Sequence, residues 1–543
     1  MLRHFWRGKH VAQNDSYLTG SYETNTNYYV KDTKTGAAIK DDRFGSNNYL
    51  KLDYYTGKFS AGLQMEGYLP AVVGYPTELK KLDLSNLYVS WKDDNFSVTA
   101  GTFYDQFGSG LLFRSWEDRA LGLNNAVIGA RFTYNYKGIV ALKAIWGMPR
   151  FGMGITNFGS KTGKELETQV RGADISFNLS ELLDWNELFL SIEASGINKF
   201  EPISTDLMSE GGKPNRFGYS ARANFEYQGF FAKGEYVDAG KKYYNNPDFT
   251  SNDWFLKKKG NAQLIELGYN KRGLGVTLTG RRLEWMDNQI IAGEPSTSNM
   301  INYVPAMCTQ YTYLLTTLHP YSSQTGMAIG NFINSGELGG QLDAFYNFRR
   351  GTAIGGKRGM KVHANFSTYY TIAKERTFRP GNLLFRDFSF DVEKQWTKQF
   401  KMVLLYSMQH YNHTYGSQAI KTGADKSFYN SNIFVADLLY KYTSTFSTRL
   451  ELQYLQTKDD QKDWMAALLE VNFAPHWSIF ASDMFNHGST RLNYYNGGVS
   501  YSKSRTRIAL GYGRYKAGYI CSGGVCRSIP AYTGANLSIT TSF

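Results

Sequence analysis

The densest group of charged and aromatic side chains in the sequence lies between residues 104 and 125. Its members are Arg114, Trp116, Glu117, Asp118 and Arg119. Opposite charges facing each other across a pore create a transverse field that favours polar solutes, and an aromatic ring offers a surface on which a sugar can stack. The same residues could instead form an ion-pair latch that fixes this segment to a neighbouring wall. The sequence leaves both interpretations open.

This segment interrupts a β-pattern. Short alternating runs at 96–103 and 127–134 flank it, and connections in β-proteins are usually two to five residues long. A connection of about twenty residues is therefore functional or disordered. Disorder is unfavourable because Phe107, Leu111, Leu112 and Phe113 carry too much apolar surface to leave in water. The segment must pack against something, and Tyr104, which opens it, could supply a second stacking ring.

No catalytic arrangement is found in the sequence. The eight His are scattered, and neither a Gly-x-Ser-x-Gly elbow nor a phosphate-binding Gly-Lys-Ser/Thr core occurs. We therefore expect no enzymatic activity, no metal site and no cofactor.

The composition favours strands and turns. Aromatic residues make up 16% of the chain, with 54 Gly and only 12 Pro, a mixture typical of strands and tight turns. The net charge of +13 is spread along the chain without a basic cluster. That distribution argues against a nucleic-acid partner. A positive total charge suits contact with anionic lipid headgroups or with anionic solutes.

Alternation with a period of two recurs along the chain. From 217 to 227 the aromatic residues Phe217, Phe225 and Tyr227 share one face, while Arg222 and Glu226 share the other. Such strands are about 10 to 13 residues long, well above the mean of soluble proteins. Short turns alternate with long loops such as residues 286–335, which are expected to be outer loops of the barrel. The pattern predicts one antiparallel transmembrane β-barrel of roughly 22 to 24 strands over residues 16–543. Residues 1–15 are expected to be a tail or the remnant of a signal region.

The barrel gives the 104–125 segment a location. We expect it to fold into the lumen, where its apolar residues find cover. Its charge knot, which consists of Arg114, Glu117, Asp118 and Arg119, is expected to pair with lumen-facing charges such as Arg131. Aromatic residues near strand ends are expected to form the girdles at the membrane surfaces. These are Tyr68, Trp91, Trp146, Trp285, Trp396 and Trp477.

The end of the chain carries two further features. Cys521 and Cys526 enclose Ser-Gly-Gly-Val, a spacing that favours a disulfide-closed turn over a zinc site and leaves Cys308 as a lone thiol. The final strand alternates strictly and stops on Phe543. It is similar to the terminal strand by which the barrel-assembly machinery recognises its substrates.

The 106–125 stretch also resembles the signature of a known family. The stretch reads QFGSGLLFRSWEDRALGLNN, and it is supported by residues 42–52, 303–306, 319–321 and 526–534. Together these resemble domain-of-unknown-function family 6029 of Bacteroidetes outer-membrane barrels, over nearly the whole chain. The resemblance implies the outer membrane of a Gram-negative bacterium but supplies no activity.

Two functions are compatible with these features. The first is a porin-like diffusion channel for polar solutes, with oligosaccharides as one class. The alternative is a non-conducting barrel that scaffolds surface lipoproteins or export machinery. In both cases outer-membrane lipid and the assembly machinery are expected partners.

Overall fold

The computed structural model describes residues 16–37, 43–75, 80–150, 168–203, 208, 211–245, 255–291, 298–321, 336–412, 428–523 and 525–543. The expected N-terminal tail, residues 1–15, lies outside the described residues. Within the described part, twenty-four strands form a single sheet. They are β1 (Tyr17–Tyr29), β2 (Phe44–Thr56), β3 (Phe59–Tyr68), β4 (Lys81–Lys92), β5 (Phe96–Phe103), β10 (Val127–Tyr136), β11 (Val140–Pro149), β12 (Gln169–Asn178), β13 (Leu188–Phe200), β14 (Asn215–Tyr227), β15 (Phe230–Asn245), β16 (Phe255–Lys271), β17 (Leu274–Glu284), β18 (Glu337–Phe348), β19 (Met360–Ile372), β20 (Pro380–Gln395), β21 (Phe400–Asn412), β22 (Phe428–Lys441), β23 (Phe446–Thr457), β24 (Trp464–Phe473), β25 (Trp477–Asn486), β26 (Asn493–Lys503), β27 (Thr506–Tyr515) and β30 (Tyr532–Ser542).

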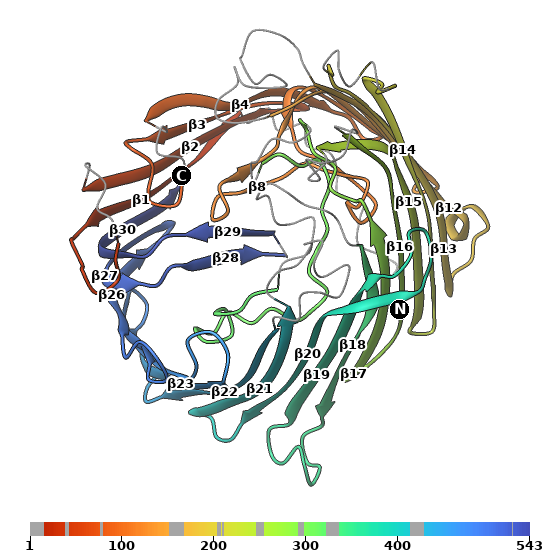
Figure 1. The fold of residues 1–543 in the computed structure, drawn as a ribbon. Coiled ribbons are helices and arrows are strands. Elements are labelled where there is room, and N and C mark those ends of the chain that lie inside the picture. Colours follow the sequence, from red (N-terminus) through yellow and green to blue (C-terminus); the bar gives the residue numbers. More distant parts are fainter. Residues whose placement is uncertain are drawn as a thin grey trace.

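The sheet closes on itself. Each strand pairs antiparallel with its neighbours in chain order, and β1 pairs with β2 on one side and with β30 on the other, as in the Thr24↔Ile539 register. Figure 1 looks into the resulting ring. Closure leaves no free sheet edge, which a membrane-spanning sheet requires. The predicted all-β barrel is confirmed, at the upper end of the expected strand number.

Alternation sorts the side chains into a polar inner face and an apolar outer face. On β14, Arg222 is 7% exposed, whereas Phe225 and Tyr227 are 37% and 38% exposed to the outside. Val98, Leu278, Leu404 and Ile479 are exposed in the same way around the wall. The outer face therefore suits lipid, and the inner face carries most of the charge.

The two ends of the barrel differ. One end has short turns, such as Gln228–Gly229 between β14 and β15, together with one helical turn, α1 (Leu179–Leu182), between β12 and β13. Both ends of the described chain lie there, since Phe543 exchanges backbone hydrogen bonds with Gly20. The other end carries the long connections. No helix in the described ranges is long and apolar enough to cross a membrane.

The expected aromatic girdle is partly wrong. Trp91, Trp146 and Trp477 are exposed on the outside. Tyr68 and Trp285, in contrast, are only 4% and 2% exposed. Tyr68 packs edge-on against Tyr49 inside the wall, and Trp285 lies where β17 ends and the chain turns into the lumen.

Three segments lie inside the ring (Figure 1). The first, residues 104–126, is called the insert and contains β6 (Gln106–Phe107), β7 (Phe113–Arg114), β8 (Glu117–Asp118) and β9 (Leu123–Asn124). The second, residues 285–291 and 298–321, is called the strap. The third is the hairpin of β28 (Gly518–Ser522) and β29 (Val525–Ile529). Together they are called the plug.

Candidate functional site

The insert is held by an apolar contact with the inner wall. Phe107, Leu111, Leu112 and Phe113 are almost completely buried, and the rings of Phe107 and Phe113 lie 5.1 Å apart. They form one cluster with inward-facing residues of the wall, which are Ile145, Val170, Ile197, Val237 and Leu283. Burial of a large apolar side chain contributes about 1.5–3 kcal/mol. The predicted lumen location of the segment is thereby confirmed.

The turn at the start of the insert needs glycine. Gly108 has a φ of +54° and Gly110 a φ of +90°, a region that side-chain-bearing residues rarely adopt. A Cβ at Gly108 would lie 2.5 Å from Cδ of Arg222 on the wall. The turn can therefore approach the wall closely only because residue 108 lacks a side chain.

The charge knot binds the opposite side of the wall. Arg119 contacts Glu23 on β1 at 2.7 Å and Glu117 at 3.3 Å, and its guanidinium lies 4.4 Å from the ring centroid of Tyr49. The amide of Gln64 on β3 donates to Glu117 at 2.9 Å. Asp118 accepts from the backbone N–H of Leu121 and so closes a local turn. These contacts are those of a latch between the insert and β1–β3.

Arg131 has a different partner from the one expected. Its Nε binds Oδ2 of Asp105 at 2.5 Å, and Lys143 binds the other oxygen of Asp105 at 3.2 Å. The prediction that Arg131 pairs with the charge knot is wrong. Arg131 instead fixes the first turn of the insert, because β10 begins directly beside it.

The aromatic residues of the insert pack mainly against other parts of the plug. Arg114 stacks 4.9 Å from the ring of Trp116 and 4.1 Å from that of Tyr303 in the strap. The Tyr104 hydroxyl donates to Asn124 and accepts from Asn86. The rings of Tyr104 and Trp116 are thus partly covered by protein. That they stack on sugar rings stays a prediction.

The strap crosses the lumen, which the sequence did not predict. It was expected to be an outer loop, yet its first part joins the insert cluster through Met286, Ile301 and Val304. Further along, Met307 and Cys308 pack against Tyr369 and Phe385. Its last part packs Leu315 against the β21–β24 wall. The apolar residues of the strap could have predicted its lumen location, because they need cover from water just as those of the insert do.

Polar contacts tie the strap to the wall at several points. Arg281 on β17 donates to the carbonyl of Pro305 at 2.5 Å and pairs with Glu337 at 2.7 Å. Buried Lys199 donates to the carbonyls of Gln289 and Ile290. His319 lies between Ser431 and Asp460, at 3.1 and 3.2 Å.

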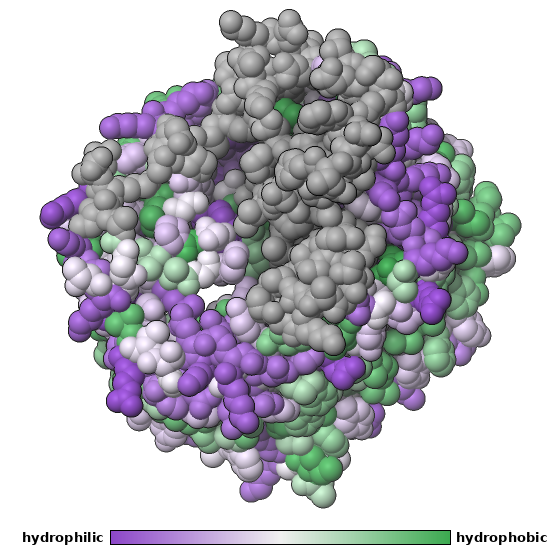
Figure 2. Space-filling model, viewed as in Figure 1, coloured by the Kyte–Doolittle hydropathy of each residue, from purple (hydrophilic) through white to green (hydrophobic). Residues whose placement is uncertain are grey.

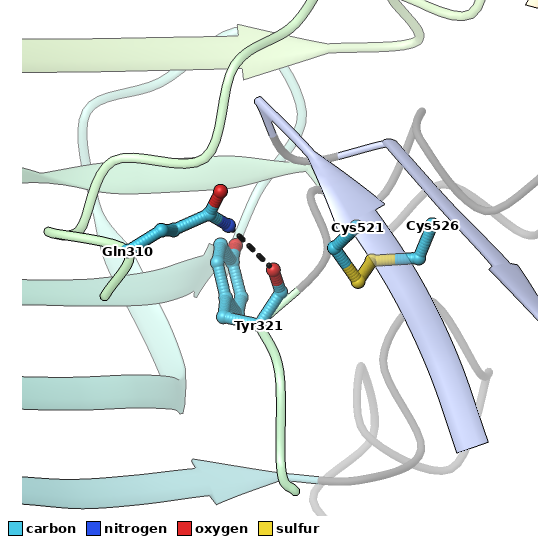
Figure 3. Close-up of a disulfide and its surroundings, with 4 residues drawn as sticks. All are labelled: Gln310, Tyr321, Cys521 and Cys526. Carbon is cyan, nitrogen blue, oxygen red and sulfur yellow. Dashed lines mark hydrogen bonds between the residues drawn. A yellow bond between two sulfur atoms is a disulfide. The ribbon is translucent and has the colours of Figure 1, made fainter. Parts of the chain in front are cut away.

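The hairpin completes the plug. Cys521 and Cys526 face each other across β28–β29 and are joined by a disulfide, with their Cα atoms 4.1 Å apart. Figure 3 shows this disulfide beside the strap residues Gln310 and Tyr321. Val525 packs with Leu121 and Leu123 of the insert, and Arg527 donates to the carbonyl of Ala120. The hairpin, the strap and the insert therefore interlock.

The lumen wall toward the short-turn end is charged and in contact with solvent. Ion pairs such as Lys401–Glu393 and Lys233–Glu266 remain partly exposed. The inner wall from β18 to β24 carries further charged side chains, which are Asp343, Asp391, Asp437 and Arg449. Figure 2 shows one face of the barrel, with a narrow opening beside hydrophilic residues.

Nothing in the described ranges suggests a metal centre. No group of three or more His, Cys, Asp or Glu side chains there is arranged to hold an ion. The terminal Phe543 packs over Gly20 at the seam between β30 and β1. Its proposed role in assembly stays a prediction.

Most of the stretches that carry the family resemblance meet in the plug, whereas residues 44–52 lie in the wall strand β2. Residues 106–125 form the insert, residues 303–306 and 319–321 belong to the strap, and residues 526–534 continue from the hairpin into β30. A closed twenty-four-stranded barrel with an apolar outer belt and an internal plug has the fold of an outer-membrane β-barrel. The chain belongs to the family of unknown function DUF6029, whose model matches residues 2–543.

Solved structures with a similar fold are large outer-membrane barrels. The siderophore receptor PirA from Pseudomonas aeruginosa is 10% identical, with 97% of this chain and 80% of the receptor covered and a TM-score of 0.43. The translocation pore of the P pilus usher PapC is 10% identical, with 97% and 99% covered and a TM-score of 0.44. A porin of Rh. blastica is 10% identical, with 61% and 93% covered and a TM-score of 0.27. No curated protein matches the sequence. These similarities assign no ligand to the chain.

Proposed function

We propose that the protein is a restricted diffusion channel for polar solutes in the outer membrane of a Gram-negative bacterium. The observation that carries the proposal is the charged, partly exposed lumen wall that leads up to the plug. Lys401 and Glu393 keep 35% and 44% of their side-chain surface exposed, which supports a lumen that holds water at this level. The proposal includes no catalytic activity and no cofactor.

The plug sets the width of the passage in this proposal. The insert reaches from the wall near Ile145 to Glu23 on β1, so it spans part of the lumen. Oppositely charged side chains along such a constriction favour polar solutes over apolar ones. Oligosaccharides are the first class to test, through block of the ionic current.

A non-conducting scaffold for surface lipoproteins is the second candidate. It is supported by the number of contacts that hold the plug, including the buried Arg281–Glu337 pair and the disulfide hairpin. In that case the plug would seal the lumen, and the long connections would bind the surface lipoprotein.

Conductance of the purified protein in a planar bilayer separates the two candidates. Wild type is expected to show small single-channel steps, and deletion of 107–123 is expected to raise them several-fold. The deletion should be tolerated, because Phe103 and Val127 are paired neighbours that a six-residue turn can join. If both proteins assemble and neither conducts, the channel is ruled out in favour of the scaffold.

A further inference from the structure

We propose that the outer surface of the barrel near β15–β17 binds the phosphate groups of a phosphorylated glycolipid of the outer leaflet. This surface, called the basic rim, consists of Lys241, Lys257, Lys374, Arg376 and Arg379. The inference depends on the outer-membrane location proposed above but is independent of whether the lumen conducts.

The connection between β19 and β20, residues 373–379, folds over the outside of the barrel. Arg282 shares the outward face of β17 with Leu278, yet it is only 2% exposed. Its Nε donates to the carbonyl of Thr377 at 2.7 Å. The connection therefore extends past β18 and covers an outward-facing residue of β17. The loop is turquoise in Figure 1 and lies beside β16, where Lys258 pairs with Glu375.

Two more contacts fix the position of this loop. The backbone N–H of Arg376 donates to Glu284 at 3.0 Å, and Lys258 on β16 pairs with Glu375 at 2.6 Å. The side chains of Lys374, Arg376 and Arg379 are exposed beside these anchors. The loop is thus held in place by its acidic and backbone groups and presents its basic ones outward.

Positive charge dominates the basic rim. Near the long-connection ends of β15 and β16, Lys241 on β15 is the register partner of Lys259 on β16. Lys257 lies two residues before Lys259 on β16. The nearby carboxylates are already engaged, since Asp238 binds Lys259, Glu284 binds Arg282 and Glu375 binds Lys258. Among the described residues, Lys241, Lys374, Arg376 and Arg379 form no ion pair. Figure 2 shows hydrophilic residues gathered at the right-hand side, where this loop lies.

An amphiphilic ligand fits this surface better than a soluble anion. Phe378 is 67% exposed, and its ring lies 5.5 Å from the guanidinium of Arg282. Ile265 and Leu278 continue the apolar outer face toward the membrane. Basic groups above an apolar surface, at the end with the long connections, match a lipid with phosphates at the outer leaflet. Arg is suited to phosphate because it can form two parallel hydrogen bonds.

Lipid binding by the purified full-length protein tests this inference. Delipidated protein in a neutral detergent is titrated with phosphorylated lipid A, and native mass spectrometry counts bound lipid. The rim variant carries Lys374→Gln, Arg376→Gln and Arg379→Gln. The control variant loses equal charge at the short-turn end through Lys398→Gln, Lys503→Gln and Arg505→Gln.

We expect the rim variant to bind phosphorylated lipid A about 100-fold more weakly, because each basic residue at an anionic surface contributes roughly fivefold in affinity. The control variant should bind like wild type, and dephosphorylated lipid A should not distinguish the three proteins. Migration in unheated gels checks that all three are folded barrels. Equal binding by the rim variant and wild type would overturn the inference, as would an equal loss in both variants. If the purified protein binds the lipid but does not conduct, only the proposed function is contradicted.

Discussion

Single ion pairs inside the barrel stabilise the wall around the plug. Arg150 at the end of β11 meets Glu66 on β3 through two hydrogen bonds of 2.9 and 2.8 Å, and their side chains are 1% and 3% exposed. Burial of either charge alone would be costly, and the paired geometry offsets that cost. The pair joins strands that lie on opposite sides of the insert, so it stabilises the wall around it.

Glu66→Gln should lower the stability of the folded barrel markedly. The guanidinium of Arg150 would stay buried without its countercharge, and loss of one partner of a buried pair costs about 3–5 kcal/mol. The measurement is the temperature at which the barrel loses its compact form in gel electrophoresis. Asp93→Asn, which removes one partner of the exposed Lys58–Asp93 pair, is the matched control and should change little. An unchanged transition for Glu66→Gln would show that the pair contributes nothing.

The two-residue period predicted which face a residue occupies, but not which residue it contacts. Arg131 was correctly placed on the inner face, yet its partner Asp105 lies in the insert, whose path the period does not encode. Tyr68 and Trp285 were misassigned for a related reason. Their position near strand ends suggested the girdle, whereas contacts distant in sequence bury them.

At the scale of elements, the strands were predictable and the interior segments were only partly so. The insert was placed in the lumen because its apolar residues needed cover. The strap has the same property at Met300, Ile301 and Leu315, but the rule that long connections face outward obscured it. Loop length alone does not distinguish an outer loop from an inner one, so the apolar content of each loop has to decide.

The β28–β29 disulfide should be present in the mature protein and should stabilise the plug modestly. The bridge closes a small ring, since the cysteines are five residues apart, and a ring of that size contributes about 2 kcal/mol. Mass spectrometry of alkylated, unreduced protein should find one blocked thiol at most, at Cys308. Burial raises the pKa of the Cys308 thiol, so even this site should react only after unfolding. Alkylation of Cys521 and Cys526 without reductant would contradict the disulfide.

The molecule as a whole is a barrel that holds the plug inside its lumen, with a charged and partly exposed inner wall toward the short-turn end. The closed circuit of strands follows from alternation, strand length and the need to leave no edge in lipid. The plug depends instead on three segments, near residues 115, 300 and 525, that lie far apart in the sequence and meet inside the closed barrel. Their mutual contacts are set by shape and charge, and no local pattern in the sequence specifies them.

Accessibility to a water-soluble maleimide tests this arrangement across the wall. Asn224 and Phe225 are neighbours on β14, with Asn224 on the inner face and Phe225 on the outer face. Arg222 is less suitable as a probe because the insert covers it at Gly108. In lipid vesicles, Asn224→Cys should be modified rapidly and Phe225→Cys should be protected, because a shift of one residue exchanges the two faces. The single thiol of wild type, Cys308, is buried and serves as the background. Faster modification of residue 225 than of residue 224 would require the inner and outer faces of β14 to be reversed.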